Sequence, residues 1–349
     1  MNIAVLNTQI PFCRGGAEVL ADDLVEALNE RGHVATIVSV PFKWYPQQSL
    51  IDNIIACKLL DISDFNGVEV EKVIALKFPM WLVEHEHKSL WILHQHRTAY
   101  ELWDTEFNDM ASMEDGALVR DLIIREDNAS IPGCEGIYTI SQNVTDRLHK
   151  YNGIPSEVLY PPPRGMDSFY NEAYGDYFFY PSRITPLKRQ ELVIDALVHA
   201  SRNVSVVFAG QADDQGYLRS LQERAERAGV ADQIIWLGHI SEEEKLKHYA
   251  NCRMVLFPSY NEDYGYVTPE AMLSSKGVIT LADSGGSLEF IDHDASGSVI
   301  PADAVALGAE LQRIRDNSDL ARRYGEGARE KVLQMDISWD KVVEHLVQS

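Results

Sequence analysis

The chain alternates short runs rich in β-branched and aromatic residues with segments whose apolar residues recur at helical spacing. Before residue 160 the β-rich runs are 3–6, 34–40, 72–78, 90–94 and 136–141. Between the first two runs, Leu20, Leu24 and Leu28 fall on one face of a helix. Strands that alternate with helices form βαβ units, whose strands lie parallel in one sheet. The pattern therefore predicts a doubly wound α/β domain.

Three consecutive prolines, Pro161–Pro163, interrupt this alternation, and they can continue neither a helix nor a sheet. After them the pattern starts again, with β-rich runs at 177–182, 204–210, 234–240, 253–259 and 278–282 and helices expected from about Leu187, from about Tyr217, after Ser241 and around Glu270. At 349 residues the chain exceeds what one hydrophobic core usually serves. We therefore expect two Rossmann-like doubly wound domains, at residues 1–165 and 166–335, with 336–349 as a closing helix.

Composition limits the possible partners and the compartment. The net charge of -22 and the isoelectric point near 4.8 disfavour a nucleic-acid partner and stable binding to an anionic membrane. The four cysteines, Cys13, Cys57, Cys134 and Cys252, form no C-x-x-C pair, which argues against a disulfide framework and a cysteine zinc site. No apolar run approaches the roughly 18 residues needed to cross a bilayer. We expect a cytoplasmic protein.

Candidate binding residues follow the predicted strands, because ligands of parallel α/β sheets bind beyond the carboxyl ends of the strands. The segment NEDYGYVTPEAM, residues 261–272, places Glu262 and Glu270 in the spacing E-x7-E directly after one predicted strand. Further candidates are the Gly15–Gly16 pair before the first helix, His94 at the end of run 90–94, and Arg183 and Lys188 in the spacing R-x4-K.

In this order, and followed by SGGSLEFI at 284–291, these motifs resemble those of the retaining nucleotide-sugar glycosyltransferases of family four, the glycosyl transferases group 1. The resemblance spans nearly the whole chain. It implies the GT-B fold, in which two Rossmann-like domains face each other across a cleft, the first on the acceptor side and the second binding the nucleotide sugar. It also implies that the helix within 336–349 crosses back to the first domain, with Trp339 as an anchor.

The resemblance implies roles for both glutamates. Glu270 would accept hydrogen bonds from the ribose hydroxyls of the donor, and Glu262 would face the transferred sugar, since hydroxyl groups need acceptors. Gly265 between them would let the loop backbone approach the ligand, so that the N–H groups of Tyr266 and Val267 could point at sugar or phosphate. The alternative is that Glu270 only favours a helix N-terminus and that Glu262 is solvated.

By the same resemblance, Arg183 and Lys188 would bind the donor diphosphate and stabilise it as it leaves. Lys188 and Arg189 are expected in the first turn of a helix, where a cation opposes the helix dipole unless an anion is bound, and Arg189 is expected to be simply exposed. Gly15 and Gly16 would bring backbone N–H groups to the same diphosphate. A plain helix-entry turn would have the same two glycines.

Histidines follow the strand predicted at 90–94. The resemblance implies that His94 hydrogen-bonds the donor sugar near the reacting carbon, and it leaves His96 and Arg97 as candidates for the acceptor side. His85 and His87 make a second His-x-His pair, which keeps a metal site open as an alternative. The family typically needs no metal, so neither a metal nor another cofactor is expected.

The motifs together predict a retaining glycosyltransferase that moves a sugar from a nucleotide-diphosphate sugar to a saccharide or lipid-linked saccharide acceptor, in surface polysaccharide or glycoconjugate assembly. Two alternatives stay open: a nucleotide-sugar epimerase of the same architecture, and a sugar-nucleotide binding protein without chemistry. Tyr264, Thr268 and Ser275 depart from the residues usual in the family. They would change the pocket wall, so the sugar and the nucleotide stay open, as does contact with a membrane.

Overall fold

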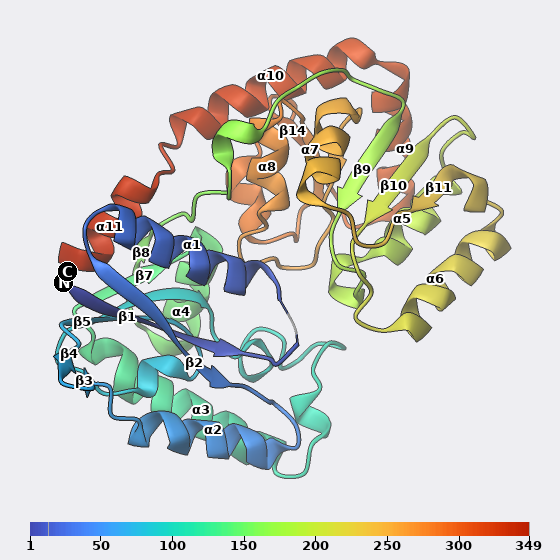
Figure 1. Cartoon of the computed structure of the whole chain (residues 1–349). Helices are drawn as coiled ribbons and strands as arrows, with labels where there is room; N and C mark the ends of the chain where they lie inside the picture. Colours follow the sequence, from blue (N-terminus) through green and yellow to red (C-terminus); the bar gives the residue numbers. More distant parts are fainter. Residues whose placement is uncertain (13, 349) are drawn as a thin grey trace. The chain divides into compact units, whose positions relative to one another are not determined.

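The computed structural model describes residues 1–12 and 14–348. It divides into two compact units, which we call the first domain (Met1–Pro162 with Ile337–Ser349) and the second domain (Pro163–Asp336) (Figure 1). The junctions expected from the sequence lie at 165/166 and 335/336. No helix among the described residues is both long and apolar enough to cross a membrane. Cys57, Cys134 and Cys252 are free thiols, and Cys13 lies outside the described residues.

The first domain is built on a six-stranded parallel sheet of order β2-β1-β5-β6-β7-β8. Its strands are β1 (Asn2–Gln9), β2 (Val34–Pro41), β5 (Lys72–Lys77), β6 (Lys88–His94), β7 (Gly136–Thr139) and β8 (Glu157–Val158), and its helices are α1 (Gly16–Glu30), α2 (Gln47–Leu59), α3 (Gly116–Ser130), α4 (Gln142–Asn152) and α11 (Trp339–Gln348). A small hairpin, β3 (Asp64–Phe65) with β4 (Val68–Glu69), precedes β5. The strand order reverses between β1 and β5.

The second domain repeats the architecture with the order β11-β10-β9-β12-β13-β14. Its strands are β9 (Tyr177–Pro181), β10 (Ser205–Ala209), β11 (Ile234–Trp236), β12 (Val255–Leu256), β13 (Val278–Leu281) and β14 (Gly297–Ile300), and its helices are α5 (Gln190–Leu197), α6 (Gln215–Ala228), α7 (Glu242–Asn251), α8 (Val267–Leu273), α9 (Ala304–Asp316) and α10 (Ser318–Gln334). Here the order reverses between β9 and β12. Ligands of doubly wound sheets bind at this kind of switch point.

Local sequence explains why these elements start where they do. The hydroxyl of Ser141 accepts a hydrogen bond from the N–H of Val144 and caps α4, and Ser241 with Glu244 forms a capping box on α7. In α1 the expected apolar face is buried. The central strands β5 and β6 are buried along almost their whole length, as parallel strands covered by helices on both faces must be.

Several expected elements differ in length. The strand expected at 234–240 ends at Trp236, because the chain then turns through Gly238 with φ +66°. The strand expected at 253–259 is only β12, and Pro258 has no N–H with which to extend it. Strand β14 was not predicted, since its run GSVI begins with glycine and serine.

The C-terminal helix α11 packs within the first domain. Val342, Val343 and Leu346 are buried, and the rings of Trp339 and of Trp91 on β6 form a T-shaped pair with centroids 6.1 Å apart. Arg31, just after α1, donates hydrogen bonds of 2.9 and 2.6 Å to Asp340. Trp339, expected to anchor this segment, thus packs against a strand of the first domain.

Candidate active site

The loops that follow β9 and β12 bring charged side chains to the switch point of the second sheet. Lys188 lies in the loop after β9, and Glu262 lies in the loop after β12. Their side chains form an ion pair, with Lys188 Nζ 2.5 Å from Glu262 Oε2, and they are only 14% and 21% exposed. Lys188, predicted to bind the diphosphate, and Glu262, predicted to bind the sugar, therefore contact each other directly.

Aromatic residues hold Lys188 in place. Its ammonium lies over the ring of Phe257, 5.0 Å from the centroid, and the buried hydroxyl of Tyr180 donates a hydrogen bond to its backbone carbonyl. A cation over an aromatic face is stabilised by the ring quadrupole. The ammonium is therefore fixed by backbone, ring and carboxylate together.

Two further cation–carboxylate pairs lie along the same edge of the sheet. Arg183, which follows β9, donates from Nη1 to Asp213 Oδ2 after β10 at 2.8 Å, and both side chains are more than half exposed. Arg189 binds both oxygens of Asp283, after β13, at 2.7 Å each, and its guanidinium covers the ring of Tyr260. An exposed pair such as the first opens at little cost, whereas a bidentate pair is stronger.

Two expectations about this loop were wrong. Lys188 ends a 3-10 turn, Pro186–Lys188, and Arg189 precedes α5 in the left-handed conformation with φ 55°. Neither cation therefore occupies the first turn of the α-helix. Arg189 is also not simply exposed, because it is 17% exposed in its pair with Asp283. The sequence could not reveal this pair, since its members are 94 residues apart.

Gly265 is required where it stands. Its φ is +79°, and a Cβ atom there would lie 2.6 Å from a ring carbon of Phe257, 2.7 Å from Ser287 Oγ and 3.2 Å from Glu262 Cγ. The loop is also tied to the end of β13, since Glu262 N donates to Ser284 O at 3.1 Å and Gly286 N donates to Glu262 O at 2.8 Å. The closely packed loop continues directly into Tyr266 and Val267, where α8 begins.

Glu270 lies in the first turn of α8 and is largely buried. Its Oε1 receives a hydrogen bond of 3.2 Å from Lys245 Nζ, and its Oε2 receives one of 2.8 Å from the hydroxyl of Tyr249. Burial raises the pKa of Glu270, while Lys245 and Tyr249 counteract that rise. Glu270 thus does more than favour the N-terminus of α8, and Glu262, 21% exposed in its pair with Lys188, is not simply solvated.

In the first domain the Gly15–Gly16 pair starts α1, as expected. The N–H of Gly15 donates to Glu18 Oε2 at 2.8 Å, and Glu18 Oε1 pairs with Lys77 Nζ at 3.0 Å at the end of β5. In this structure the Gly15 N–H is therefore held by a carboxylate of its own helix. An anion at this turn would have to take the place of Glu18 or bind beside it.

His94, which ends β6, and His96, two residues later, lie in different environments. His94 is half-buried, with Nδ1 2.7 Å from the carbonyl oxygen of Gln95. His96 packs against the rings of Phe42 and Phe78 at 6.2 and 5.4 Å, and burial lowers the pKa of His96 to about 4, so its ring is neutral at physiological pH.

Arg97, the other candidate for the acceptor side, is engaged within the first domain. Its Nε donates to Glu101 Oε1 at 2.5 Å, and Arg147 approaches the same oxygen at 3.1 Å. The side chain is 16% exposed. Contacts inside the first domain are therefore sufficient to explain the position of Arg97, without a role toward the acceptor.

His85 and His87 stabilise a turn. His85 Nε2 lies 2.9 Å from the carbonyl of Val70, and His87 Nδ1 lies 2.8 Å from Glu135 Oε1. Throughout residues 1–12 and 14–348, no group of three or more histidine, cysteine, aspartate or glutamate side chains is arranged to hold a metal ion.

Four participants were missed by sequence reasoning. Asp213 and Asp283 follow strands, so the rule that found Arg183 could have suggested them. Lys245 and Tyr249 lie on α7 and carry no local signal, because only packing of α7 beside α8 brings them to Glu270.

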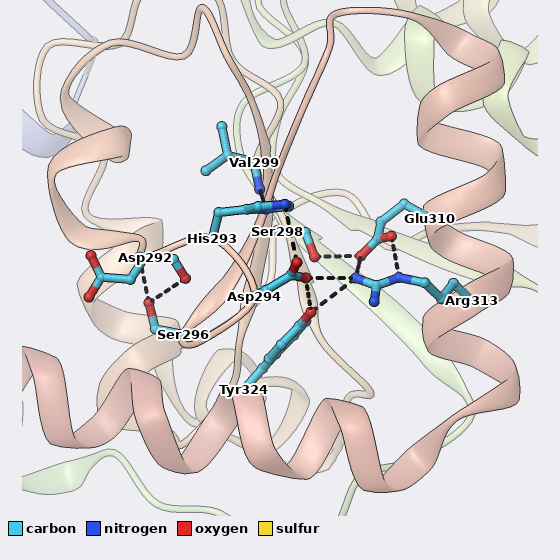
Figure 2. A network of polar contacts seen from close by, with 9 residues as sticks. All are labelled: Asp292, His293, Asp294, Ser296, Ser298, Val299, Glu310, Arg313 and Tyr324. Atoms are coloured by element: carbon cyan, nitrogen blue, oxygen red, sulfur yellow. Dashed lines mark hydrogen bonds and ion pairs between the residues drawn. The ribbon is translucent and has the colours of Figure 1, made fainter.

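A second polar network lies elsewhere in the second domain (Figure 2). Arg313 on α9 joins Glu310, Asp294 and the hydroxyl of Tyr324, and Glu310 also accepts a hydrogen bond from Ser298. Asp294 precedes β14, so the network lies at the amino end of that strand. Ligands of such sheets bind at the carboxyl ends, and the network therefore serves to join α9 and α10 to β14.

Comparison with known proteins finds glycosyltransferases that are similar to part of the chain. Residues 172–331 match the family model of glycosyl transferases group 1. A D-inositol 3-phosphate glycosyltransferase of Streptomyces bingchenggensis is 28% identical over 172 residues, covering 46% of this chain and 37% of that protein. O-antigen chain mannosyltransferase C of Escherichia coli is 26% identical over 171 residues, covering 48% and 44%. The matched segment thus spans less than half the length of these relatives.

Solved structures match along the whole chain. HepE of Anabaena, in complex with UDP and glucose, has a TM-score of 0.73 at 18% identity and covers 100% of both chains. Sucrose-phosphate synthase from Thermosynechococcus elongatus has a TM-score of 0.77 at 18% identity and covers 99% and 97%. At this identity the matches establish the fold. The chain therefore has the two-domain GT-B fold, and residues 172–331 of its second domain are similar to the glycosyl transferases group 1 family.

Proposed function

We propose that the chain is a retaining glycosyltransferase that moves a sugar from a nucleotide-diphosphate sugar to a hydroxyl of a saccharide or lipid-linked saccharide, without a metal ion. The observation that carries the proposal is the Lys188–Glu262 pair at the switch point of the group 1 domain. An ammonium suits a diphosphate, and an adjacent carboxylate suits the hydroxyls of the sugar attached to it.

Lys188 and Arg183 stabilise the charge that develops on the leaving diphosphate. Arg183 can turn from the exposed Asp213 toward the phosphate groups. Lys188 stays over Phe257, where its ammonium also attracts the diphosphate of the donor. Glu262 accepts hydrogen bonds from the transferred sugar. Glu270 accepts them from the ribose, and the backbone of Gly265, Tyr266 and Val267 approaches the donor.

Transfer occurs on one face of the sugar. The bond between the anomeric carbon and the diphosphate oxygen breaks, the acceptor oxygen bonds to the same face, and the acceptor proton passes to the leaving phosphate oxygen. His94 hydrogen-bonds the sugar near the reacting carbon, and Gly15–Gly16 approaches the diphosphate. The similarity to an O-antigen chain mannosyltransferase supports a role in surface polysaccharide assembly.

The donor is identified by thermal unfolding with UDP, GDP and ADP and their sugars. A ligand at 100 times its dissociation constant should add about 2.7 kcal/mol of stability. Nucleotide release and product linkage are then measured with saccharide acceptors, with and without EDTA. Epimerised donor in the absence of acceptor would favour the epimerase, binding without turnover would favour a binding protein, and activity lost in EDTA would refute the metal-independent reaction.

Lys188→Ala should reduce turnover by about 100-fold, as expected when a preorganised group that stabilises transition-state charge is removed. The matched control is Lys247→Ala, which removes an exposed lysine paired with Glu243 on α7. If Lys188→Ala folds and keeps turnover within a few fold of the control, Lys188 does not stabilise the leaving group.

A further inference from the structure

Helix α7 presents two side chains to the carboxylate of Glu270. Lys245 and Tyr249 are four residues apart, so both fall on the same face of the helix. Lys245 Nζ reaches Oε1 at 3.2 Å, and the hydroxyl of Tyr249 reaches Oε2 at 2.8 Å. Each oxygen of the carboxylate thus receives one hydrogen bond from α7, and these two contacts determine its orientation.

Burying the charges of Lys245 and Glu270 would cost free energy if this arrangement served packing alone. Lys245 is 20% exposed and Glu270 is 12% exposed, so both ions have lost most of their hydration. Lys245 also lies in the second turn from the N-terminus of α7, where a cation gains nothing from the helix dipole. Buried ion pairs contribute little net stability compared with apolar residues of the same size.

Tyr249 is fully buried and packs edge-on against the rings of Phe169 and Phe179, at 6.0 and 5.2 Å between centroids. Its ring therefore has little freedom to move. A carboxylate oxygen can accept two or more hydrogen bonds, so the bonds from α7 leave capacity on both oxygens of Glu270.

We propose that Lys245 and Tyr249 are positioning residues for Glu270, which hold its carboxylate so that the remaining lone pairs face the ribose hydroxyls of the donor nucleotide. The inference rests on the proposed function, in which Glu270 binds the ribose. Lys245 and Tyr249 need not touch the nucleotide; they act through the orientation and the charge of Glu270.

The charges around Glu270 give the sign of the pH effect. Burial raises the pKa of Glu270 most strongly and Glu242 adds to the rise, whereas Lys245 on α7 lowers this pKa and Tyr249 lowers it by its hydrogen bond. Glu242 Oε2 lies 2.8 Å from Lys245 Nζ and shares its charge. Without Lys245 the pKa of Glu270 rises further, so ribose recognition is lost at a higher pH as the solution is acidified.

The test combines protein variants with altered ligands. Dissociation constants are measured for the nucleoside diphosphate among UDP, GDP and ADP that the wild type binds, and for its 2′-deoxy and 3′-deoxy counterparts. A hydroxyl bound to a charged acceptor contributes enough for the wild type to prefer the ribonucleotide by about tenfold. Lys245→Met and Tyr249→Phe should each reduce this preference to about threefold or less and leave the affinity for the deoxynucleotide nearly unchanged. Lys245→Met should also shift the acid limit of ribonucleotide binding to higher pH.

Lys247→Met is the matched control, because it removes a lysine of the same helix that pairs with Glu243 at 2.6 Å in solvent. It should keep the preference of the wild type. Tyr249→Phe removes a single oxygen and keeps the ring packing, so the inference stays testable if Lys245→Met does not fold.

The remaining outcomes separate the inference from the proposed function. If both variants keep the wild-type preference for the ribonucleotide over the deoxynucleotide, the inference is overturned. This holds even if the unfolding midpoint and both affinities fall together, because a purely structural role would lower both affinities equally. A wild type that binds ribo- and deoxynucleotides equally refutes ribose binding by Glu270, and with it the inference, while sugar transfer still stands. A wild type that binds no nucleotide refutes the proposed function itself.

Discussion

Gly265→Ala tests whether the loop between Glu262 and Glu270 is as tightly packed as the structure indicates. The φ of +79° costs an alanine about 1–2 kcal/mol. The new Cβ would also lie 2.6 Å from Phe257 and 2.7 Å from Ser287 Oγ, and both side chains are buried. Overpacking of this kind costs about a further 1–3 kcal/mol. We expect a total loss of about 2–5 kcal/mol in the free energy of unfolding.

Gly238→Ala is the matched control in the same domain. Gly238 has φ +66°, but a Cβ there would meet no atom within 4 Å. Its substitution should therefore cost only the backbone contribution, about 1–2 kcal/mol. The difference between the two variants isolates the cost of the contacts in the Gly265 loop.

The assay is equilibrium unfolding in urea, followed by nucleotide binding to the folded variants. Because Phe257 lies under the ammonium of Lys188, its displacement in Gly265→Ala should also weaken diphosphate binding, whereas Gly238→Ala should bind normally. If Gly265→Ala were no less stable than Gly238→Ala, the loop would have room for a side chain and the close approach inferred here would be wrong.

Two buried ionisable groups lead to further predictions. Burial raises the pKa of Asp127, which accepts hydrogen bonds from Trp81 and Tyr100, to about 7. The folded chain then holds a proton that the unfolded chain has lost above about pH 4, so this contribution to stability declines from pH 4 to 7, by at most about 1.4 kcal/mol per pH unit. Asp127→Asn should remove that decline in urea unfolding, and an unchanged slope would contradict the assignment. Burial lowers the pKa of Lys276, which donates to Asn171 at 2.6 Å, to about 8. Stability should therefore rise from pH 8 towards pH 10, and Lys276→Met should abolish the rise; its persistence would point to another group.

Much of the fold follows from local pattern. The β-rich runs at 3–6 and 72–78 became the buried strands β1 and β5, since near-continuous apolar runs suit the interior of a parallel sheet. The run at 34–40 became β2, an edge strand with no buried residue, in which β-branched residues favour the extended backbone. Ser141 and Ser241 cap the helices that follow them, since a cap needs only a side chain and a backbone N–H two or three residues away.

The site was predicted in part for a similar reason. Carboxyl ends of parallel strands meet at one edge of the sheet, so the order of strands along the chain predicts that residues after different strands are neighbours. Lys188 and Glu262 do meet there. The strand ends were less predictable, as β11 and β12 show, because a strand stops where its neighbours stop pairing with it as well as where its own sequence turns.

The amino-acid sequence alone determined the alternation of strands and helices, the helix caps and the positions of the polar residues after the strands. All of these depend on residues a few positions apart. The tertiary structure decided which charges pair. Lys188 with Glu262, Arg189 with Asp283, and Lys245 with Glu270 join residues 74, 94 and 25 positions apart. Each pairing depends on how separate helices and loops pack, because that packing brings two charged groups within about 3 Å of each other and buries them. The degree of burial then determines the strength of the ion pair.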